Sequence, residues 1–364
     1  MDRRAFSLPL ARPLGTAAGT IRRREGDLLR IEVEDGGDGV RGVGEATPLP
    51  GWTESLDDCR AALDAVADAD ADAATLLDAA AAAPRDPLAA APSTVTAPLD
   101  DAPAARHAVE SAILDAFGRH TGRPLATVLG DDSATRVPVN ATVGDATVAE
   151  TVAAAEDAAD AGFDCLKVKV GVGDLDRDVA RLRAVREAVG TDLTLRADAN
   201  GAWDRETARE AVDAFASLEL SYLEQPLAAD DLDGHATLRE QGVGIALDET
   251  LASAPVDAVL AADAADVLVL KPMSLGGPAR ADAAARRALE SGVDPVVTTT
   301  IDAAPARTAA VHVAAAVSRV RACGLATADV LESDLVPDPA PVEAGSVTVP
   351  AGPGIGGDAF DDLF

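Results

Sequence analysis

The chain of 364 residues carries 62 acidic and 31 basic residues, which gives a formal net charge of −31. Its hydrophobic content of 48% excludes a disordered chain, and its length is sufficient for one large domain or two smaller ones. The acidic residues are spread along the whole sequence, which we interpret as adaptation to a very salty cytoplasm, where salt screens self-repulsion. Nucleic acid and anionic membranes are poor partners for such a surface.

The three cysteines, Cys59, Cys165 and Cys323, are widely spaced and form no Cys-x-x-Cys pair. We therefore expect neither a disulfide framework nor a zinc site. No long apolar segment follows the amino terminus, and no stretch has the length and apolar character of a membrane span. We expect a soluble, cytoplasmic protein without a membrane partner, and a homo-oligomer stays open.

The first 50 residues predict β-structure with turns. Residues 27–33 alternate in part, residues 35–39 are typical of a turn, and residues 42–46 predict the return strand. Residues 53–83 are rich in alanine, which favours helix. Residues 106–121 predict an amphipathic helix that ends near Gly122.

From residue 137, short β-branched runs alternate with segments of helical spacing. The runs are residues 137–143, 165–170, 193–197, 221–223, 244–247, 267–270 and 295–299. They begin roughly every 23 to 28 residues, which is typical of β-then-α units around a parallel sheet. Seven units without a dinucleotide-binding glycine pattern favour a closed barrel, with a weak eighth element at residues 320–323. A doubly wound open sheet is the alternative.

Only three of the 31 basic residues are lysines, namely Lys167, Lys169 and Lys271. Arginine is effectively always charged, whereas lysine can lose its proton and act as a base. Lys167 and Lys169 share one face of a strand because side chains alternate along it. We therefore interpret the lysines as carriers of chemistry rather than of surface charge.

Asp198, Glu224, Asp248 and Lys271 end four successive predicted strands, at spacings of 26, 24 and 23 residues. Each spacing is one β/α repeat, so the four side chains should meet at one mouth of a barrel. Three carboxylates at one height repel unless a hard cation lies between them, and oxygen ligands favour Mg²⁺, with Mn²⁺ as an alternative. Such a cation stabilises the enediolate that forms when a proton leaves the carbon next to a substrate carboxylate.

Each acidic residue has a structural alternative when it is taken alone. Asp198 and Asp248 could begin the helices that follow them, and Glu224 could be a turn residue. The ordered set with the three lysines favours the catalytic interpretation. The four histidines lie away from the predicted strand ends, so we expect neither a histidine base nor a zinc ligand.

With this ordered set, the chain resembles the enolase superfamily, in its muconate-lactonizing subgroup, over essentially its whole length. Residues 42–51 resemble part of the family's capping domain. The resemblance implies an α/β fold, a modified (β/α)₇β TIM-type barrel at residues 126–335. It also implies an α+β capping domain at residues 1–125 and a carboxy-terminal segment, residues 336–364, that returns to that domain.

The resemblance also implies roles for the predicted residues and a small-molecule carboxylate substrate. Lys169 resembles the base, Lys167 its partner at the substrate carboxylate, and Lys271 the lysine on the opposite face. The residues that resemble the metal ligands are Asp198, Glu224 and Asp248. Residues expected to support these ligands or to contact substrate are Asn200, Glu249, Asn140, Thr298, Thr299 and Thr300. Specificity would come from capping loops, here residues 14–20 and 52–53.

Within the subgroup, residues 137–142, 298–302 and 324–336 resemble the o-succinylbenzoate synthases, carbon–oxygen lyases of menaquinone biosynthesis. The absence of histidine from residues 298–302 disfavours the mandelate racemase branch. A dipeptide epimerase or N-succinylamino acid racemase stays open, with Lys271 as a second base. The Asp-x-Asp frequent after the last strand of dipeptide epimerases is missing, and Asp329 with Asp334 is the nearest pair. A Schiff-base aldolase, which needs no metal, and a non-enzymatic cation-binding protein are further alternatives.

Overall fold

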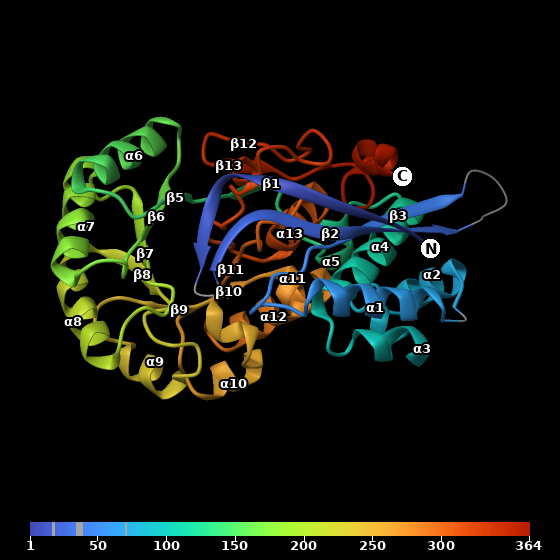
Figure 1. Cartoon of the computed structure of the whole chain (residues 1–364), viewed down its shortest axis with the longest axis horizontal. Coiled ribbons are helices and arrows are strands. Elements are labelled where there is room, and N and C mark those ends of the chain that lie inside the picture. The colour runs from blue at the N-terminus through green and yellow to red at the C-terminus, as the bar shows by residue number, and fades with distance from the viewer. Residues whose placement is uncertain (17–18, 34–38, 70) are drawn as a thin grey trace.

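The computed structural model describes residues 1–16, 19–33, 39–69 and 71–364. An amino-terminal antiparallel sheet with helices packs beside a curled parallel sheet, and the two parts form the two ends of an elongated molecule (Figure 1). The turn predicted at residues 35–39 lies outside the described residues except for Gly39. No described helix is long and apolar enough to cross a bilayer.

The amino-terminal part, which we call the capping part, is built on three antiparallel strands in the order β1-β2-β3. These are β1 (Asp2–Thr16), β2 (Gly19–Val33) and β3 (Val40–Ala46). Its helices are α1 (Leu56–Ala67), α2 (Ala73–Ala82), α3 (Ser93–Thr96), α4 (Pro103–Thr121) and α5 (Leu125–Leu129). The alanine-rich stretch at 53–83 thus forms two helices, because Asp72 caps a new start by accepting a hydrogen bond from the Thr75 N–H.

Helix α4 is the centre of the capping part. It ends where the sequence predicts, with Gly122 in a left-handed conformation at φ 68°. The prediction that it is amphipathic is wrong, because every residue from 104 to 118 is buried. Strand β3 lies so close to α4 that a Cβ on Gly44 would overlap the carbonyl oxygen of Ala108. Glycine is therefore required where these two backbones meet.

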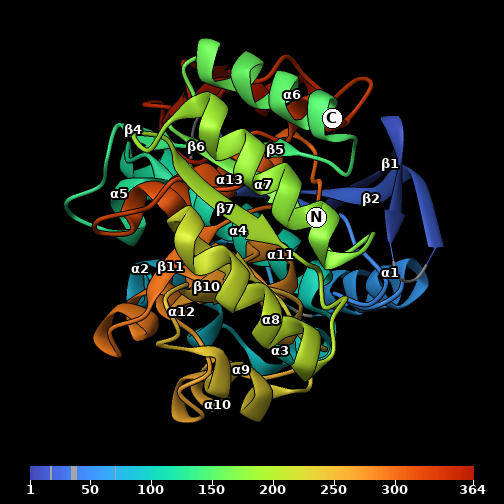
Figure 2. The same cartoon turned by 90° about the vertical axis from the view of Figure 1, so that its left-hand side faces the viewer.

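The predicted parallel sheet is confirmed, with seven strands in the order β11-β10-β9-β8-β7-β6-β5. The strands are β5 (Ala141–Val143), β6 (Cys165–Lys169), β7 (Thr194–Asp198), β8 (Leu220–Glu224), β9 (Ile245–Leu247), β10 (Val267–Leu270) and β11 (Asp294–Val297). The helices between and after them are α6 (Val148–Asp160), α7 (Leu175–Val189), α8 (Arg205–Phe215), α9 (Leu232–Leu238), α10 (Val256–Ala261), α11 (Pro272–Leu275), α12 (Pro278–Glu290) and α13 (Ala304–Ala316). Figure 2 shows α6, α7 and α8 on the outer face of the sheet.

The sheet is closed by backbone hydrogen bonds around Cys323 and Gly324. The Asn140 N–H donates to the Cys323 carbonyl oxygen at 3.0 Å, and the Gly324 N–H donates to the Val297 carbonyl oxygen at 2.9 Å. The weak eighth element is thus a pair of isolated bridges in the described chain, to Val139 and to Thr298. The run at residues 137–143 is split between two sheets, since β4 (Arg136–Pro138) pairs with β13 (Ser346–Thr348), which also pairs with β12 (Val342–Glu343).

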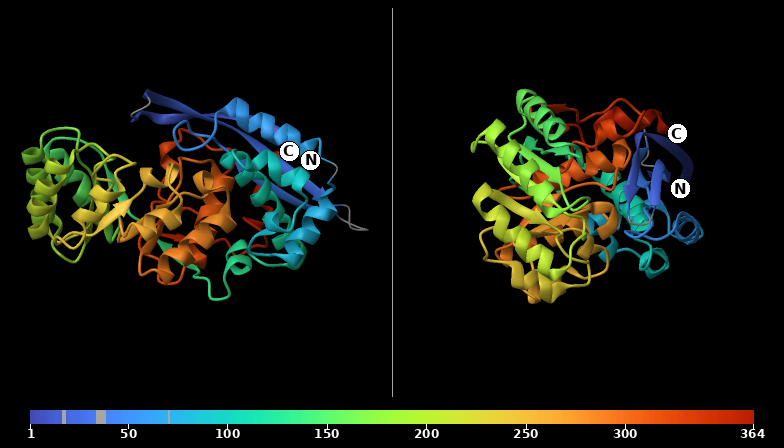
Figure 3. Two further views of the ribbon diagram at one scale, coloured as in Figure 1. Left: turned by 90° about the horizontal axis from the view of Figure 1, so that it is seen from below. Right: turned by 60° about the vertical axis from the view of Figure 1, so that its left-hand side comes forward.

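The carboxy-terminal segment returns to the capping part, as the resemblance implies, and the two termini lie side by side (Figure 3). The Ile355 N–H donates to the buried carboxylate of Asp115 on α4 at 2.7 Å. The guanidinium of Arg119, also on α4, pairs with Asp361 at 2.7 Å. The last residues therefore complete the packing of the capping part.

Helix caps show how the capping part is joined to the barrel. Helices α6, α7, α8 and α9 each begin with a capping side chain of their own. Helix α12 begins after Gly277 without such a cap, and the Ala279 N–H instead donates to Glu110 of α4 at 2.7 Å. Burial raises the pKa of Glu110 to about 7, although Arg106 and the Ala279 N–H act in the opposite direction.

Replacing Gly44 by Ala should destabilise the fold by about 2–4 kcal/mol, because the new methyl group forces β3 away from α4. Denaturant unfolding in molar KCl measures the change. Gly144→Ala is the control, since a Cβ there meets nothing within 4 Å. Equal effects of the two substitutions would contradict the requirement for glycine at this contact.

Glu110 should make stability depend on pH. A carboxyl group whose pKa is raised in the folded state contributes stability that is present below its unfolded pKa and lost as pH rises through the folded value, here about 7. The free energy of unfolding should therefore fall between pH 5 and 8, by an amount on the order of 3 kcal/mol. Glu110→Gln should flatten this part of the profile, whereas Glu206→Gln on the surface should leave it intact.

Candidate active site

The predicted lysines and carboxylates lie at the carboxyl ends of neighbouring strands. Lys169 on β6 is in register with Asp198 on β7, which is in register with Glu224 on β8, so the three side chains leave the sheet at one height. Asp248 directly follows β9 and Lys271 directly follows β10. In the strand order, the three strands that carry the acids therefore lie between the two that carry the lysines.

The lysines contact these acids directly. The Lys169 Nζ donates to Asp198 Oδ2 at 2.6 Å, and the Lys271 Nζ donates to Asp248 Oδ2 at 2.6 Å. The Lys167 Nζ lies between two acids, at 2.8 Å from Glu224 Oε1 and 3.0 Å from Asp198 Oδ2. The structure thus brings together all six side chains to which the sequence assigns catalysis or metal binding. Lys167 and Lys169 contact Asp198 and Glu224, and Lys271 contacts Asp248.

Asn200 and Glu249 extend this network. Asn200 has φ 45°, a left-handed conformation that asparagine tolerates, and its Oδ1 accepts from Lys169 Nζ at 2.7 Å. Its Nδ2 donates to Glu249 Oε1 at 2.8 Å. Lys169 is therefore held from two sides, by a carboxylate and by an amide.

The three lysines differ in burial. The side chain of Lys169 is 31% exposed, against 16% for Lys167 and 11% for Lys271. Burial acts to lower the pKa of Lys167, but the carboxylates of Asp198 and Glu224 outweigh it and raise that pKa well above its usual value. Lys167 is thus a fixed cation, and Lys169 is the lysine that reaches furthest out of the protein.

The negative charges of the three carboxylates are balanced by lysine contacts to different extents. Burial would raise the pKa of Asp198, but contact with Lys167 and Lys169 lowers it below its usual range. Burial raises the pKa of Glu224 to about 7 and that of Asp248 to about 6, because one lysine contact each does not offset the loss of water and the neighbouring negative charge. The site is therefore short of positive charge around Glu224 and Asp248.

These acids fit a hard divalent cation. Glu224 Oε2, Asp248 Oδ1 and Glu249 Oε2 are buried and have no hydrogen-bond partner. Three ammonium groups face four carboxylates, a formal charge of −1 that becomes −2 if one lysine is neutral. Among the described residues, no three acidic side chains are already arranged to hold a metal ion. Lysine ammonium groups lie against these acids instead. Oxygen donors with spare lone pairs are the ligands that Mg²⁺ and Mn²⁺ take.

The capping part reaches this site through Trp52, one of the predicted specificity positions. The Lys271 Nζ lies 3.3 Å from the centre of the Trp52 ring, in a cation–π contact. Trp52 is half-buried and lies in the turn after β3, where its N–H donates to the Leu49 carbonyl oxygen at 2.9 Å. In the other predicted specificity loop, residues 14–20, residues 17 and 18 lie outside the described chain.

Asn140 and the three threonines have hydrogen bonds outside the lysine network. Asn140 Nδ2 donates to the Ala141 carbonyl oxygen, which places it at the seam of the sheet. Thr298 Oγ1 donates to the Gly324 carbonyl oxygen at 2.8 Å, and Thr300 Oγ1 donates to Asp302 Oδ1 at 2.5 Å. Thr299 Oγ1 lies 3.0 Å from Thr327 Oγ1, so hydroxyl groups gather beyond β11. A substrate role for these four residues stays a prediction.

Sequence reasoning missed Arg196 and Gln225. Arg196 is buried beneath Asp198, donates to the Ala322 carbonyl oxygen at 2.7 Å and stacks on Tyr222. A charged residue two positions before Asp198, on the same strand face, was the available signal. Gln225 Oε1 accepts from the Asp248 N–H at 3.0 Å and so fixes the turn that carries this acid.

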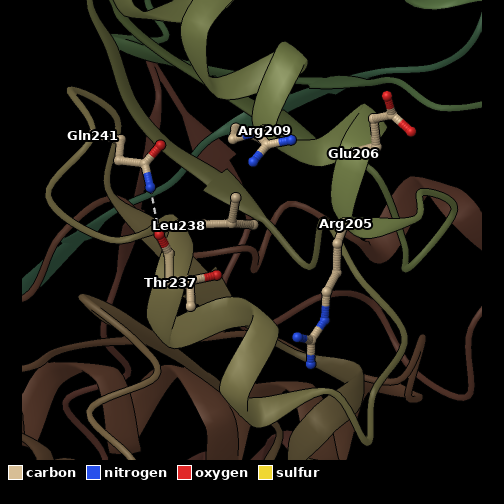
Figure 4. Close-up of a pocket in the computed structure, with 6 residues that line it drawn as sticks. All are labelled: Arg205, Glu206, Arg209, Thr237, Leu238 and Gln241. Carbon is tan, nitrogen blue, oxygen red and sulfur yellow. Dashed lines mark hydrogen bonds between the residues drawn. The ribbon is translucent and has the colours of Figure 1, made fainter.

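A separate hollow of about 520 Å³ lies between α8 and α9, away from the strand ends. Figure 4 shows Arg205 and Arg209 at its wall, with Gln241 donating to the Thr237 carbonyl oxygen. Arg205 is already paired with Asp231. None of the predicted site residues lines this hollow, so the lysine–carboxylate network is the candidate active site.

Known protein families match nearly the whole chain. Residues 3–130 match the mandelate racemase / muconate lactonizing enzyme N-terminal domain, and residues 150–362 match the enolase C-terminal domain-like family. The chain is 30% identical to an L-Ala-D/L-Glu epimerase of Bacillus subtilis over 360 residues, covering 96% of this chain and 94% of that protein. It is 38% identical to an o-succinylbenzoate synthase of Mycolicibacterium smegmatis over 261 residues, covering 70% and 75%.

Among solved structures, a dipeptide epimerase from Enterococcus faecalis V583, complexed with Mg and the dipeptide L-Leu-L-Tyr, superimposes with a TM-score of 0.83. The two chains are 27% identical, and the match covers 98% of each. Both domains of the family are thus matched in sequence and in architecture. The chain belongs to the mandelate racemase / muconate lactonizing enzyme family of the enolase superfamily.

Proposed function

We propose that this protein removes the proton next to the carboxylate of a small-molecule substrate, with Mg²⁺ held by Asp198, Glu224 and Asp248. Mn²⁺ would suit the same oxygen donors. The observation that carries the proposal is the pair of lysine-bearing strands, β6 and β10, on the two flanks of the strands that bear the acids. In this arrangement a base would lie on one face of a bound substrate and a cation on the other.

Lys169 is the proposed base. Its side chain is the most exposed of the three, and hydrogen bonds to Asp198 and Asn200 fix the position of its Nζ. As a neutral amine, Lys169 accepts the α-proton, and as an ammonium it returns a proton to the departing hydroxyl. When bound, the cation would stabilise negative charge on the substrate carboxylate. Lys167 stays charged between its two acids, and Lys271 supplies positive charge from the opposite face.

Within this chemistry we propose o-succinylbenzoate synthase activity, the dehydration step of menaquinone biosynthesis. A dipeptide carries an ammonium group that needs an acidic partner when it is buried. Asp334, one of the acids after the last barrel element, already accepts from the Ala304 N–H at 3.0 Å and the Leu335 N–H at 2.7 Å. Asp329 is exposed, and the Thr299 and Thr327 hydroxyls lie within hydrogen-bond distance of each other at 3.0 Å. This supports a substrate without an ammonium group.

Dipeptide epimerase activity is the second candidate. The epimerase relative of Bacillus subtilis matches 96% of this chain, which is more than the synthase relative of Mycolicibacterium smegmatis matches. In this reaction Lys271 would return a proton to the opposite face of the α-carbon. The Lys271 Nζ donates to Asp248 and contacts the face of the Trp52 ring, so it lies next to one of the proposed metal ligands.

The two activities are separated by incubating the protein with Mg²⁺ in molar KCl. High salt is used because a net charge of −31 needs screening, and we propose a salty cytoplasm as the working environment. We expect the cyclohexadiene carboxylate substrate to be dehydrated to o-succinylbenzoate, followed by ultraviolet absorbance and stopped by EDTA. Failure of that reaction, together with solvent deuterium at the α-carbon of recovered dipeptides in D₂O, would establish the epimerase instead.

Lys169→Arg should lower turnover by at least about 10³-fold, because arginine keeps the charge but cannot accept a proton at neutral pH. Mg²⁺ should still raise the melting temperature of this variant, since the three acidic ligands are intact. Arg183→Lys on the outer helix α7 is the control for a basic exchange. Turnover within tenfold of the parent protein would remove Lys169 as the base.

A further inference from the structure

The loop between β11 and α13 is held in a strained conformation. Ile301 in this loop has φ 62°. A β-branched residue is a genuine outlier in this left-handed region, because its side chain crowds the following carbonyl group. Such a conformation persists only where the surrounding structure imposes it, and it is found most often at functional sites. One of the residues that contact Ile301 is Arg24 of the capping part.

Arg24 of β2 holds the loop from the capping part. It is 3% exposed, and its guanidinium donates to three backbone carbonyl groups. These are the carbonyl oxygens of Ile301 at 3.1 Å, Pro48 at 3.2 Å and Thr47 at 2.7 Å. The strained residue is thus tied to the segment that follows β3 and leads to Trp52.

Glu45 of β3 holds the start of the next helix. Helix α13 has no capping side chain at its own N-cap residue, Ala303. The Glu45 carboxylate accepts from the Ala303 N–H at 2.8 Å and the Ala306 N–H at 2.9 Å, and the Thr47 hydroxyl also donates to it. A carboxylate at this position satisfies free N–H groups and opposes the positive end of the helix dipole.

The clamped loop carries the predicted substrate-side threonines. The Ile301 N–H donates to Thr299 Oγ1 at 3.3 Å, so the strained peptide orients that hydroxyl. Asp302 accepts from the Thr300 hydroxyl at 2.5 Å and from the Thr300 N–H at 3.3 Å. Asp302 and Glu45 are both buried near Arg24. Burial and the neighbouring Asp302 carboxylate nevertheless raise the pKa of Glu45 to about 8. The clamp and the threonine hydroxyls are therefore parts of one connected set of contacts.

We propose that Arg24 and Glu45 are positioning residues that hold the β11–α13 loop in its strained conformation and thereby set the wall of the substrate site next to β10. The capping part then contributes to substrate binding without contacting the substrate at these two residues. The effect on turnover rests on the proposed function, whereas the effect on the loop does not.

Three substitutions test this clamp: Arg24→Met removes the cation, Glu45→Gln keeps the shape of the side chain, and Ile301→Gly removes the strain. Arg23→Met is the matched control, since Arg23 directly precedes Arg24 on β2 and is exposed. If Arg24→Met does not fold, Arg24→Lys keeps the charge while losing the forked contacts to three carbonyl groups. Hydrogen–deuterium exchange of residues 298–306 and steady-state kinetics are measured for each.

Arg24→Met should speed exchange of residues 298–306 by about tenfold or more relative to the Arg23→Met control. It should raise KM more than it lowers kcat and leave the Mg²⁺-induced rise in melting temperature unchanged. In the Ile301→Gly background the same substitution should cost less stability, because glycine adopts φ 62° without a clamp. Glu45→Gln should keep most of the protection of residues 298–306 against hydrogen exchange, since the remaining carbonyl oxygen of the glutamine can still accept from one of the two N–H groups.

The clamp is overturned if Arg24→Met lowers the melting temperature but leaves exchange of residues 298–306 equal to the rest of the barrel. It is also overturned if Arg24→Met costs the same stability with Ile301 and with Gly at that position. If the parent protein turns over neither proposed substrate, the proposed function fails, and the exchange and stability measurements still decide the clamp.

Discussion

The structure depends on the balance of buried charge at the carboxyl ends of β7, β8 and β9. Burying carboxylates next to one another costs more than their packing can offset, unless cations are equally close. Lys167 meets this need by lying between Asp198 and Glu224. Lysine is suited to such a position because its small ammonium group contacts two acids at once, and the rest of the chain uses arginine. The remaining unpaired oxygens are those that a divalent cation would take.

The part of the site that could be predicted from sequence is the part fixed by strand register. Spacings of one β/α repeat put Asp198, Glu224 and Asp248 at one edge, and β6 to β9 are paired accordingly. No such rule connects Glu45 to α13, because the Glu45–Ala303 contact joins residues 258 positions apart in the sequence. Arg24 gave no signal of its own for the same reason, because it follows two other arginines and precedes a glutamate in a polar stretch of the strand.

The errors in the fold also have physical causes. The polar residues of α4 suggested a solvated face, but Glu110 and Asp115 are buried because each accepts hydrogen bonds from backbone groups of another segment. The last barrel element was weak in sequence because Cys323 and Gly324 make single bridges rather than a ladder. In both cases a distant backbone segment, absent from the local pattern, supplies the stabilising partner.

The two halves of the barrel differ in what caps the starts of their helices. Helices α6 to α9, which follow β5 to β8 and so accompany the strands bearing Lys169, Asp198 and Glu224, start with caps of their own. Helix α12 takes its cap from Glu110 of the capping part, and α13 takes its cap from Glu45 of the capping part together with Asp334 of the carboxy-terminal half. The first half can therefore keep its geometry while the capping part changes, whereas the wall beyond β11 changes with it. The similarity to proteins named as epimerases and to proteins named as synthases therefore directs the search for substrate-selecting residues to the place where the two parts meet.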